Sequence, residues 1–203
     1  RDPLDGLREP RAPAEPVQLL SDEELKRLLA VCRGRSFTDL RDTAIFRVLI
    51  STGLRVGELV SMRVDDVDLA DSRALVSGKG GKVRPVYFAA KTARALDRYL
   101  WARRRHRYSH LPELWIGERG ALGEAAIRYL CRTRGREAGI EGLHPHRLRH
   151  TFAHSWLRRG GAEGNLMRLA GWSSRDMLSR YGAAGADMRA RAEYDRLRPG
   201  DDL

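Results

Sequence analysis

The chain has 203 residues and a formal net charge of +11, with 38 lysines and arginines against 27 aspartates and glutamates. This excess of positive charge favours an anionic partner, nucleic acid first and an acidic membrane surface second. The sequence shows no apolar run long enough to cross a bilayer and no signal peptide at its beginning. Two cysteines, Cys32 and Cys131, are too few for a zinc cluster or a disulfide framework, so we expect a reducing, cytoplasmic environment.

The first part of the chain predicts a linker followed by three helices. Residues 1–20 are rich in proline, arginine and glutamate and have no period, which is typical of a linker. Ser21 and Glu24 form a capping-box pattern at the start of a helix. An apolar second helix is expected over 39–52 and a short third one over 56–62.

The stretch "VDLADSRALVSGKGGKVRPVYF" changes the period and predicts three short antiparallel strands, with turns at 71–72 and 78–81. Beyond it we expect helices over 90–105, 122–138, the segment that ends at Gly160–Gly161, 163–170, 174–181 and 187–197. The sequence therefore predicts a mainly α (α+β) fold with a small three-stranded antiparallel sheet. We divide it into a linker (1–20), a main domain (21–186) and a helical tail (187–203).

The stretch "GLHPHRLRHTFAHSWLRRGG" carries four of the six histidines. On a helix, His146, Arg149 and His150 share one face, while Leu148 and Phe152 lie roughly opposite. We expect the cationic groups to gather together and the apolar groups to face the core. His146 and His150 have the spacing of a zinc pair, but residue 147 is an arginine where a catalytic glutamate would stand, so no metal is expected. The alternative is a solvated basic face with His150 in the interior.

Three further residues have types that suit phosphate chemistry. In "TGLRVGELVSM", Arg55 opens a helix with Glu58 one turn later, which suits a guanidinium fork held for a phosphate. In "SGKGGK", Lys79 lies in a glycine-rich turn that can bring an ammonium close to a ligand, with Lys82 as the competing choice. Tyr181 follows "LAGWSSRDMLSR" in a polar segment that offers little to bury it.

Together these motifs resemble the tyrosine recombinases of the phage-integrase family. The resemblance runs from about Leu20 to Tyr181 and rests on "TGLRVGEL", "SGKGGKVRPV", "HPHRLRHTFA", "LAGW" and the tyrosine nine residues after Trp172. It departs from the family in two ways. Most members have histidine where this chain has Trp172, and members usually carry a helical DNA-clamping domain before the catalytic one, so residues 1–20 are expected to be the linker from such a domain.

The resemblance implies a site-specific recombinase or integrase that joins DNA to Tyr181 through a 3′-phosphotyrosyl bond. The implied catalytic residues are Arg55, Lys79, His146, Arg149, Trp172 and the nucleophile Tyr181, with Glu58 and His150 in support. We expect Lys82, Arg84, His144 and Arg147 to contact DNA. Other basic residues, among them Arg103, Arg107, Arg132, Arg134 and Arg158, are expected to add phosphate contacts.

No cofactor is expected, because the bond energy is retained in the protein–DNA ester. The expected partners are double-stranded DNA, further copies in a synaptic tetramer and accessory DNA-bending or directionality proteins. The tail over 187–197 is expected either to dock on a neighbouring protomer or to pack on its own domain. The alternatives are an inactive DNA-binding module, a DNA-relaxing enzyme of type IB topoisomerase kind and, remotely, a helical zinc hydrolase.

Overall fold

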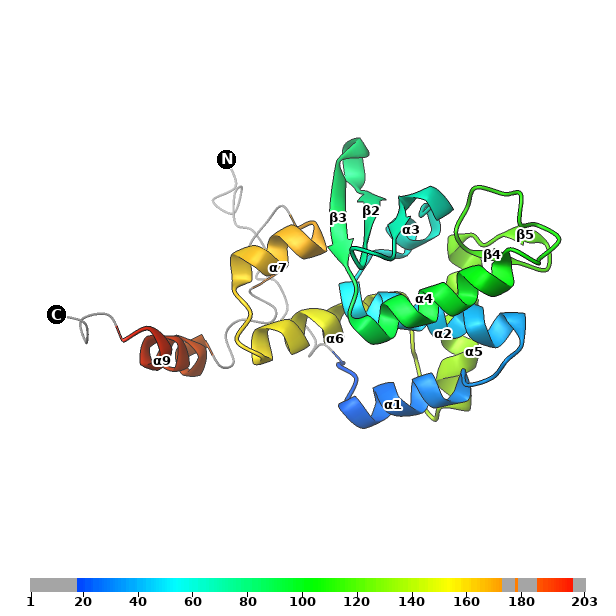
Figure 1. Ribbon diagram of the computed structural model, residues 1–203. Coiled ribbons are helices and arrows are strands. Elements are labelled where there is room, and N and C mark those ends of the chain that lie inside the picture. Colours follow the sequence, from blue (N-terminus) through cyan, green and yellow to red (C-terminus); the bar gives the residue numbers. More distant parts are fainter. Residues whose placement is uncertain (1–17, 173–177, 179–185, 199–203) are drawn as a thin grey trace, which may run out of the picture.

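The computed structural model describes residues 18–172, 178 and 186–198 and shows a mainly helical domain with two small sheets (Figure 1). The predicted helix over 174–181 and residues 1–17 lie outside the described residues, apart from Leu178, which is helical. The elements are α1 (Asp22–Val31), α2 (Phe37–Thr52), α3 (Val56–Val60), β1 (Val67–Asp68), β2 (Arg73–Ser77), β3 (Val83–Tyr87), α4 (Ala90–Arg103), β4 (Ile116–Gly117), β5 (Gly120–Ala121), α5 (Glu124–Glu137), α6 (Pro145–Arg158), α7 (Glu163–Ala170) and α9 (Ala186–Leu197).

The helix starts follow local capping chemistry. The Ser21 side chain accepts a hydrogen bond from the Glu24 backbone N–H at 3.1 Å, and Glu24 accepts one from the Ser21 N–H at 2.8 Å, so the predicted capping box is confirmed. Helix α2 begins two residues before the predicted start. The reason is Ser36, whose side chain accepts from the Asp39 N–H and caps the helix there.

The predicted meander is present as an antiparallel sheet in the order β1-β2-β3. In β2 the side chains of Ala74 and Val76 point into the core while their neighbours are exposed. Leu75 of β2 lies opposite Pro85 of β3, and the two strands meet at the glycine-rich turn over Lys79–Gly81. The sheet therefore holds this turn at a fixed place on the edge of the domain.

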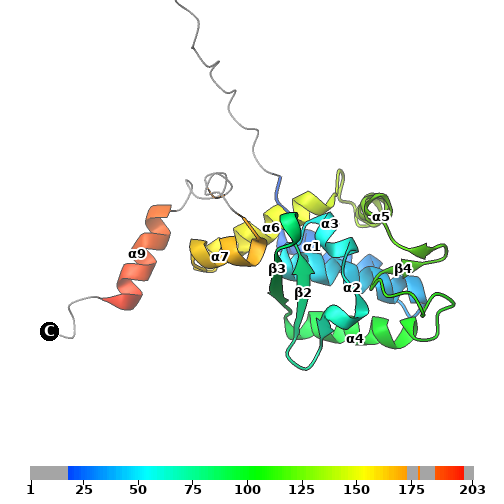
Figure 2. The same ribbon diagram turned by 90° about the horizontal axis from the view of Figure 1, so that it is seen from above.

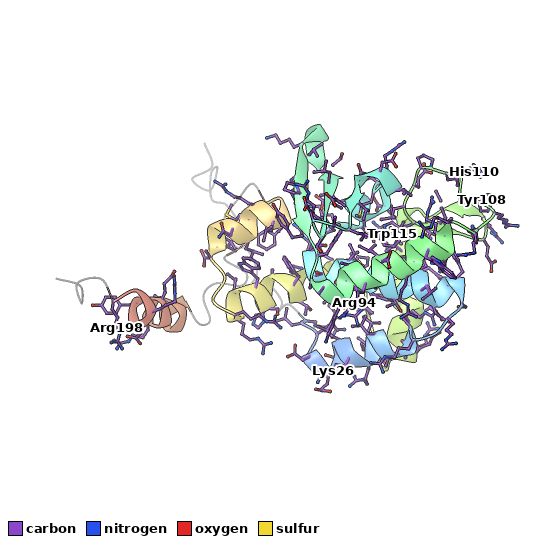
Figure 3. All side chains as sticks on the ribbon, viewed as in Figure 1. Lys26, Arg94, Tyr108, His110, Trp115 and Arg198 are labelled. Atoms are coloured by element: carbon purple, nitrogen blue, oxygen red, sulfur yellow. The ribbon has the colours of Figure 1, made fainter. Side chains whose placement is uncertain are left out.

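A second, two-stranded sheet of β4 and β5 was not predicted. It lies next to Trp115, which is fully buried between α3 and α4, donates to the Leu59 carbonyl and stacks on Tyr99 (Figure 3). Arg103 is also buried here and donates four hydrogen bonds to backbone carbonyls of the loop that precedes β4. The expectation that Arg103 contacts DNA is therefore wrong, because its guanidinium is enclosed by its own domain.

Helix α6 is buried on more than one side, which corrects the expected division into a cationic and an apolar face. Arg149, His150 and Ala153 are buried along with Leu148, whereas Phe152 is only partly buried. The cause is α7, which packs against α6 and forms with it a small second cluster of apolar side chains. A guanidinium on that face must then find partners inside the protein.

Helix α2 forms the centre of the domain and contacts both α4 and α6. Helix α4 lies on one side of α2, and α5 and α6 lie on the other (Figure 2). The predicted tail helix is present as α9, which stands apart from the main domain in both views (Figures 1 and 2). In the part of the chain that the structure describes, every helix is too short or too polar to span a membrane.

Candidate phosphate-binding site

Arg149 is the most enclosed charged group of the candidate site, with 2% of its surface exposed. Its two terminal nitrogens donate to the carbonyls of Gly53 at 2.6 Å and Ala170 at 2.8 Å. Its guanidinium carbon lies 5.4 Å from the centre of the Trp172 ring. Burial and, after it, the nearby charge of Arg55 lower the pKa of Arg149 to about 10, so the group remains a cation at neutral pH.

Arg55 is more open, with 46% of its side chain exposed. It donates from one nitrogen to Glu58 at 3.1 Å and from the other to the Gly171 carbonyl at 3.1 Å. Its own backbone N–H donates to the second Glu58 oxygen at 2.9 Å. The predicted role of Glu58 in holding the Arg55 fork therefore agrees with this geometry.

The sequence did not reveal that Glu58 serves two arginines. Arg84, on β3, donates to both carboxylate oxygens of Glu58 at 2.9 and 3.0 Å and to the Leu169 carbonyl at 3.1 Å. Burial raises the pKa of the Glu58 carboxyl, but the hydrogen bonds from Arg84 and from the Arg55 backbone outweigh it, so the pKa lies below its ordinary value. The buried anion thus stays charged and fixes both guanidiniums.

Two glycines lie against these groups, and one of them, Gly171, is required for the close approach of Arg84. Gly171 ends α7 with a φ of +64°, and a side chain there would come within 2.9 Å of the Arg84 guanidinium carbon. Gly78, at the base of the turn between β2 and β3, lies next to both Arg84 and Glu58. The turn that carries Lys79 therefore begins beside the arginine pair.

A pocket of about 330 Å³ opens beside these groups and is lined by residues of α3, α5 and α6. It contains Arg55, Arg149, His144 and His146, which come from distant parts of the sequence. The His146 ring packs edge-on against the His150 ring with centres 4.2 Å apart. The structure also adds Arg128, which pairs with Glu124 one helical turn earlier on α5. That i,i+4 pair was visible in the sequence, but its place at the pocket was not.

Other site residues are placed less completely. The backbone of Lys79 lies in the turn near Gly78, and Lys82 is exposed next to it; the Lys79 side chain falls outside what is described. Trp172 is buried against Arg149 in the α6–α7 cluster. Tyr181, the predicted nucleophile, lies outside the described residues, so its role remains a prediction.

The structure gives internal partners to two residues that were expected to contact DNA. Arg84 has only 15% of its side chain exposed and is held by Glu58. Arg147 has 11% exposed and donates to the carbonyls of Glu141 and Leu19, with Glu24 at 3.6 Å. Both guanidiniums stabilise the domain in this arrangement. Arg134, expected to contact phosphate, instead joins Asp42 and Glu137.

The arrangement is suited to holding an anion that bears several oxygens. The guanidiniums of Arg55 and Arg149 line one pocket, and no aspartate or glutamate among the described residues lines it; Glu58 pairs with Arg55 from outside that lining. In the described parts of the chain, no three His, Cys, Asp or Glu side chains group together as metal ligands, and the His146–His150 pair lacks a third donor of that kind. Guanidinium forks that line one pocket have the charge and the geometry to bind a phosphate group.

Comparison with known proteins agrees with the site. The model of the phage integrase family matches residues 18–187. Among curated proteins, the tyrosine recombinase XerC of Staphylococcus saprophyticus is 33% identical over 162 residues, which is 79% of this chain and 55% of that protein. XerC of Actinobacillus pleuropneumoniae is 31% identical, covering 85% of this chain and 56% of that protein. The chain thus spans little more than half the length of these relatives.

Solved structures show the same fold. The XerA recombinase superposes with a TM-score of 0.77 at 35% identity, covering 95% of this chain and 68% of that one. The Tn1549 transposon integrase, solved in complex with transposon right end DNA, has a TM-score of 0.72 at 22% identity and covers 96% of this chain and 70% of that one. Neither the inactive-module nor the topoisomerase alternative gains support from these matches.

Proposed function

The chain belongs to the phage integrase family, and from that premise we propose that it is the catalytic part of a site-specific tyrosine recombinase or integrase. It would cut and rejoin double-stranded DNA through a covalent 3′-phosphotyrosyl intermediate. The observation that carries the proposal is the convergence of Arg55 and Arg149 on one pocket with His146. The DNA complexes of the structural neighbours support DNA as the substrate.

The proposed chemistry assigns each group one task. Arg55 and Arg149 bind the nonbridging oxygens of the scissile phosphate, where charge builds in the transition state. The phenol oxygen of Tyr181 attacks phosphorus, and the bond from phosphorus to the 5′ oxygen breaks. His146 takes the phenolic proton or orients the phosphate, and Lys79 protonates the leaving 5′ oxygen. Attack by a second 5′ hydroxyl reverses these steps and releases Tyr181.

The remaining residues support this centre. Glu58 fixes Arg55, while Trp172 covers Arg149 and shields the pocket from water. His150 packs on His146 and holds its ring in place. Lys82 and His144 are exposed beside the site and are proposed to contact DNA. We further expect a synaptic tetramer on DNA, accessory DNA-bending or directionality proteins, and action on cytoplasmic DNA.

The nucleophile is tested with Tyr181→Phe. A labelled pool of nicked duplexes of randomised sequence traps covalent complexes, because the short cut strand diffuses away and rejoining fails. The wild-type chain is expected to shift the label to a protein-linked band on a denaturing gel. The Phe variant should give no such band while it binds the duplex nearly as well as wild type.

Tyr194→Phe is the matched control, because it makes the same chemical change at an exposed tyrosine of α9. It should link DNA like the wild-type chain. Covalent linkage by the Tyr181 variant would show that another residue is the nucleophile. Absence of linkage in every chain, with DNA bound, would favour the inactive module.

A further inference from the structure

A large basic hollow lies on a part of the domain that the proposed chemistry does not use. It has a volume of about 720 Å³ and is formed by the end of α1, the loop between α1 and α2, one side of α2 and one side of α4. We call it the far groove. Its cationic lining residues are Arg33, Arg35, Arg47, Lys91, Arg94 and Arg98. Figure 3 shows Arg94 on the side of α4 that faces α1.

The charge of the far groove is unbalanced. Among the residues that the structure describes, no aspartate or glutamate lines it. Within the described residues, none of its six cations forms an ion pair, although other partly buried arginines such as Arg41 and Arg134 do. Burial lowers the pKa of Arg47, and the charges of Arg33 and Arg94 lower it further, so these cations repel one another. An external anion would relieve that repulsion.

The spacing of the cations suits a polyanion whose negative charges repeat along a chain. Lys91, Arg94 and Arg98 recur about once per turn along one side of α4, a row of roughly 10 Å at the helical rise of about 1.5 Å per residue. Five of the six cations are arginines, whose forks bind phosphate through two parallel hydrogen bonds. A whole duplex is too wide to enter the hollow, but the backbone of one strand can lie along this row.

The far groove is also separated from the candidate site. The site pocket is lined by α3, α5 and α6, whereas the groove includes α4, which lies on the other side of α2 (Figure 2). The two hollows share no lining residue. We propose that the far groove binds the phosphate backbone of a second DNA segment, without regard to its sequence. The inference rests on the proposed function only in naming DNA as the polyanion.

The first test compares salt dependence in the full chain carrying Tyr181→Phe, which keeps DNA binding noncovalent. The groove variant combines Lys91→Gln, Arg94→Gln and Arg98→Gln. The control combines Lys26→Gln, Arg73→Gln and Arg191→Gln, which removes the same charge from exposed cations that each pair with a nearby acidic residue. Binding of a random-sequence duplex is measured by fluorescence anisotropy over a range of salt concentrations.

Each lost phosphate contact reduces the magnitude of the negative slope of log K against log salt by about 0.9. The slope of the groove variant should therefore be less steep than that of the parent chain by about 2–3, and the slope of the control should be almost unchanged. Equal slopes for the groove variant, the control and the parent chain would overturn the proposal.

The second test places the photo-crosslinker p-benzoylphenylalanine at the position of Arg94. Irradiation with labelled duplex should join DNA to this position, and Arg55→Gln at the candidate site should not prevent it. Crosslinking to another protein chain and not to DNA would show a protein-binding surface and overturn the proposal. If crosslinking succeeds while the wild-type chain never forms the covalent tyrosine linkage, the proposed function fails and the far groove stands.

Discussion

Arg149 shows how one side chain can be structural and chemical together. Its two carbonyl partners, Gly53 and Ala170, fix the plane of the guanidinium and leave its remaining N–H groups for a phosphate. A lysine has neither the planar fork nor the reach to bridge both carbonyls. We therefore expect Arg149→Lys to slow covalent linkage by roughly 100-fold or more.

This prediction is checked by timing covalent linkage on the nicked duplex under single-turnover conditions. DNA binding should change far less than the rate, because many phosphate contacts lie elsewhere. A near-normal rate would mean that charge alone is enough and that the fork is not needed.

Glu58 predicts a pH dependence of stability. Its carboxyl has a pKa below the ordinary value of 4.5 in the folded domain. It therefore contributes stability at pH values above about 4.5, and that contribution is lost as the pH falls through the lower folded-state pKa. Glu58→Gln should reduce the free energy of unfolding by about 1–3 kcal/mol at neutral pH, and this difference should shrink in acid.

Urea unfolding of wild type and variant at several pH values between neutral and acid measures this difference. Glu23→Gln is the control, since Glu23 is exposed and its pair with Lys26 lies on the surface. A Glu58 difference that stays constant with pH would show that the carboxylate charge is not what holds the two arginines.

At the scale of single residues, the sequence predicted the contact between Arg55 and Glu58 and did not predict their partners from distant parts of the chain. Arg55 and Glu58 are close in sequence, so a helical turn explains their contact in advance. Arg84 joins Glu58 only because β3 lies beside α3 and α7 in the folded domain. An arginine that the sequence predicts to be exposed, such as Arg84, can therefore be the internal partner of a buried carboxylate.

Among the elements, the end of α2 contacts both the apolar packing around Phe152 and the candidate site at Arg149. Gly53 ends this helix with a φ of +61°, its carbonyl accepts from Arg149, and a side chain there would meet Phe152 at 2.4 Å. Gly53→Ala should therefore cost both backbone strain, about 1–2 kcal/mol, and an overpacking term of about 1–3 kcal/mol. It should also slow covalent linkage, because the Arg149 acceptor shifts.

The control Gly139→Ala measures the cost of backbone strain without the overpacking term. This glycine has a φ of +67° with open space around the added carbon, so only the strain term applies. Urea unfolding of both variants gives the comparison. Equal losses of stability would show that the domain relaxes around Phe152 without cost.

The helices with clear caps and periods were predictable, and the elements set by neighbours were not. Strands β4 and β5 have two residues each, which is too short for any alternation to show. The buried position of Arg149 depends on α7 packing over α6, a contact between two helices that no local pattern contains. Tertiary packing determines both the pairing of β4 with β5 and the burial of Arg149.

For the whole molecule, the fold class and its one predicted sheet followed from period and turn signals, and the confirmed family followed from the order of the motifs. The far groove did not, because its cations come from the loop between α1 and α2, from α2 and from α4, which meet only in the folded domain. At this scale we also predict that the reaction needs no metal ion, since the two arginines supply the positive charge that a phosphate requires.

Metal removal tests this prediction. The chain and the nicked duplex are treated with chelating resin, and covalent linkage is then compared with EDTA and with added Mg²⁺ or Zn²⁺. The rates should agree within about twofold, a difference of less than 1 kcal/mol in the barrier. Loss of linkage in EDTA and its recovery with one ion would place a cation in the mechanism.

The two arginines of the site share one anchor. Arg149 donates to the carbonyl of Ala170, and Arg55 donates to the carbonyl of the next residue, Gly171. These two carbonyls end α7 and lead directly into the segment that contains Tyr181. A displacement of this single turn would therefore take one hydrogen-bond acceptor away from each guanidinium, leaving Arg149 on Gly53 and Arg55 on Glu58. A change at the end of α7 would therefore act on both guanidiniums of the pocket at once.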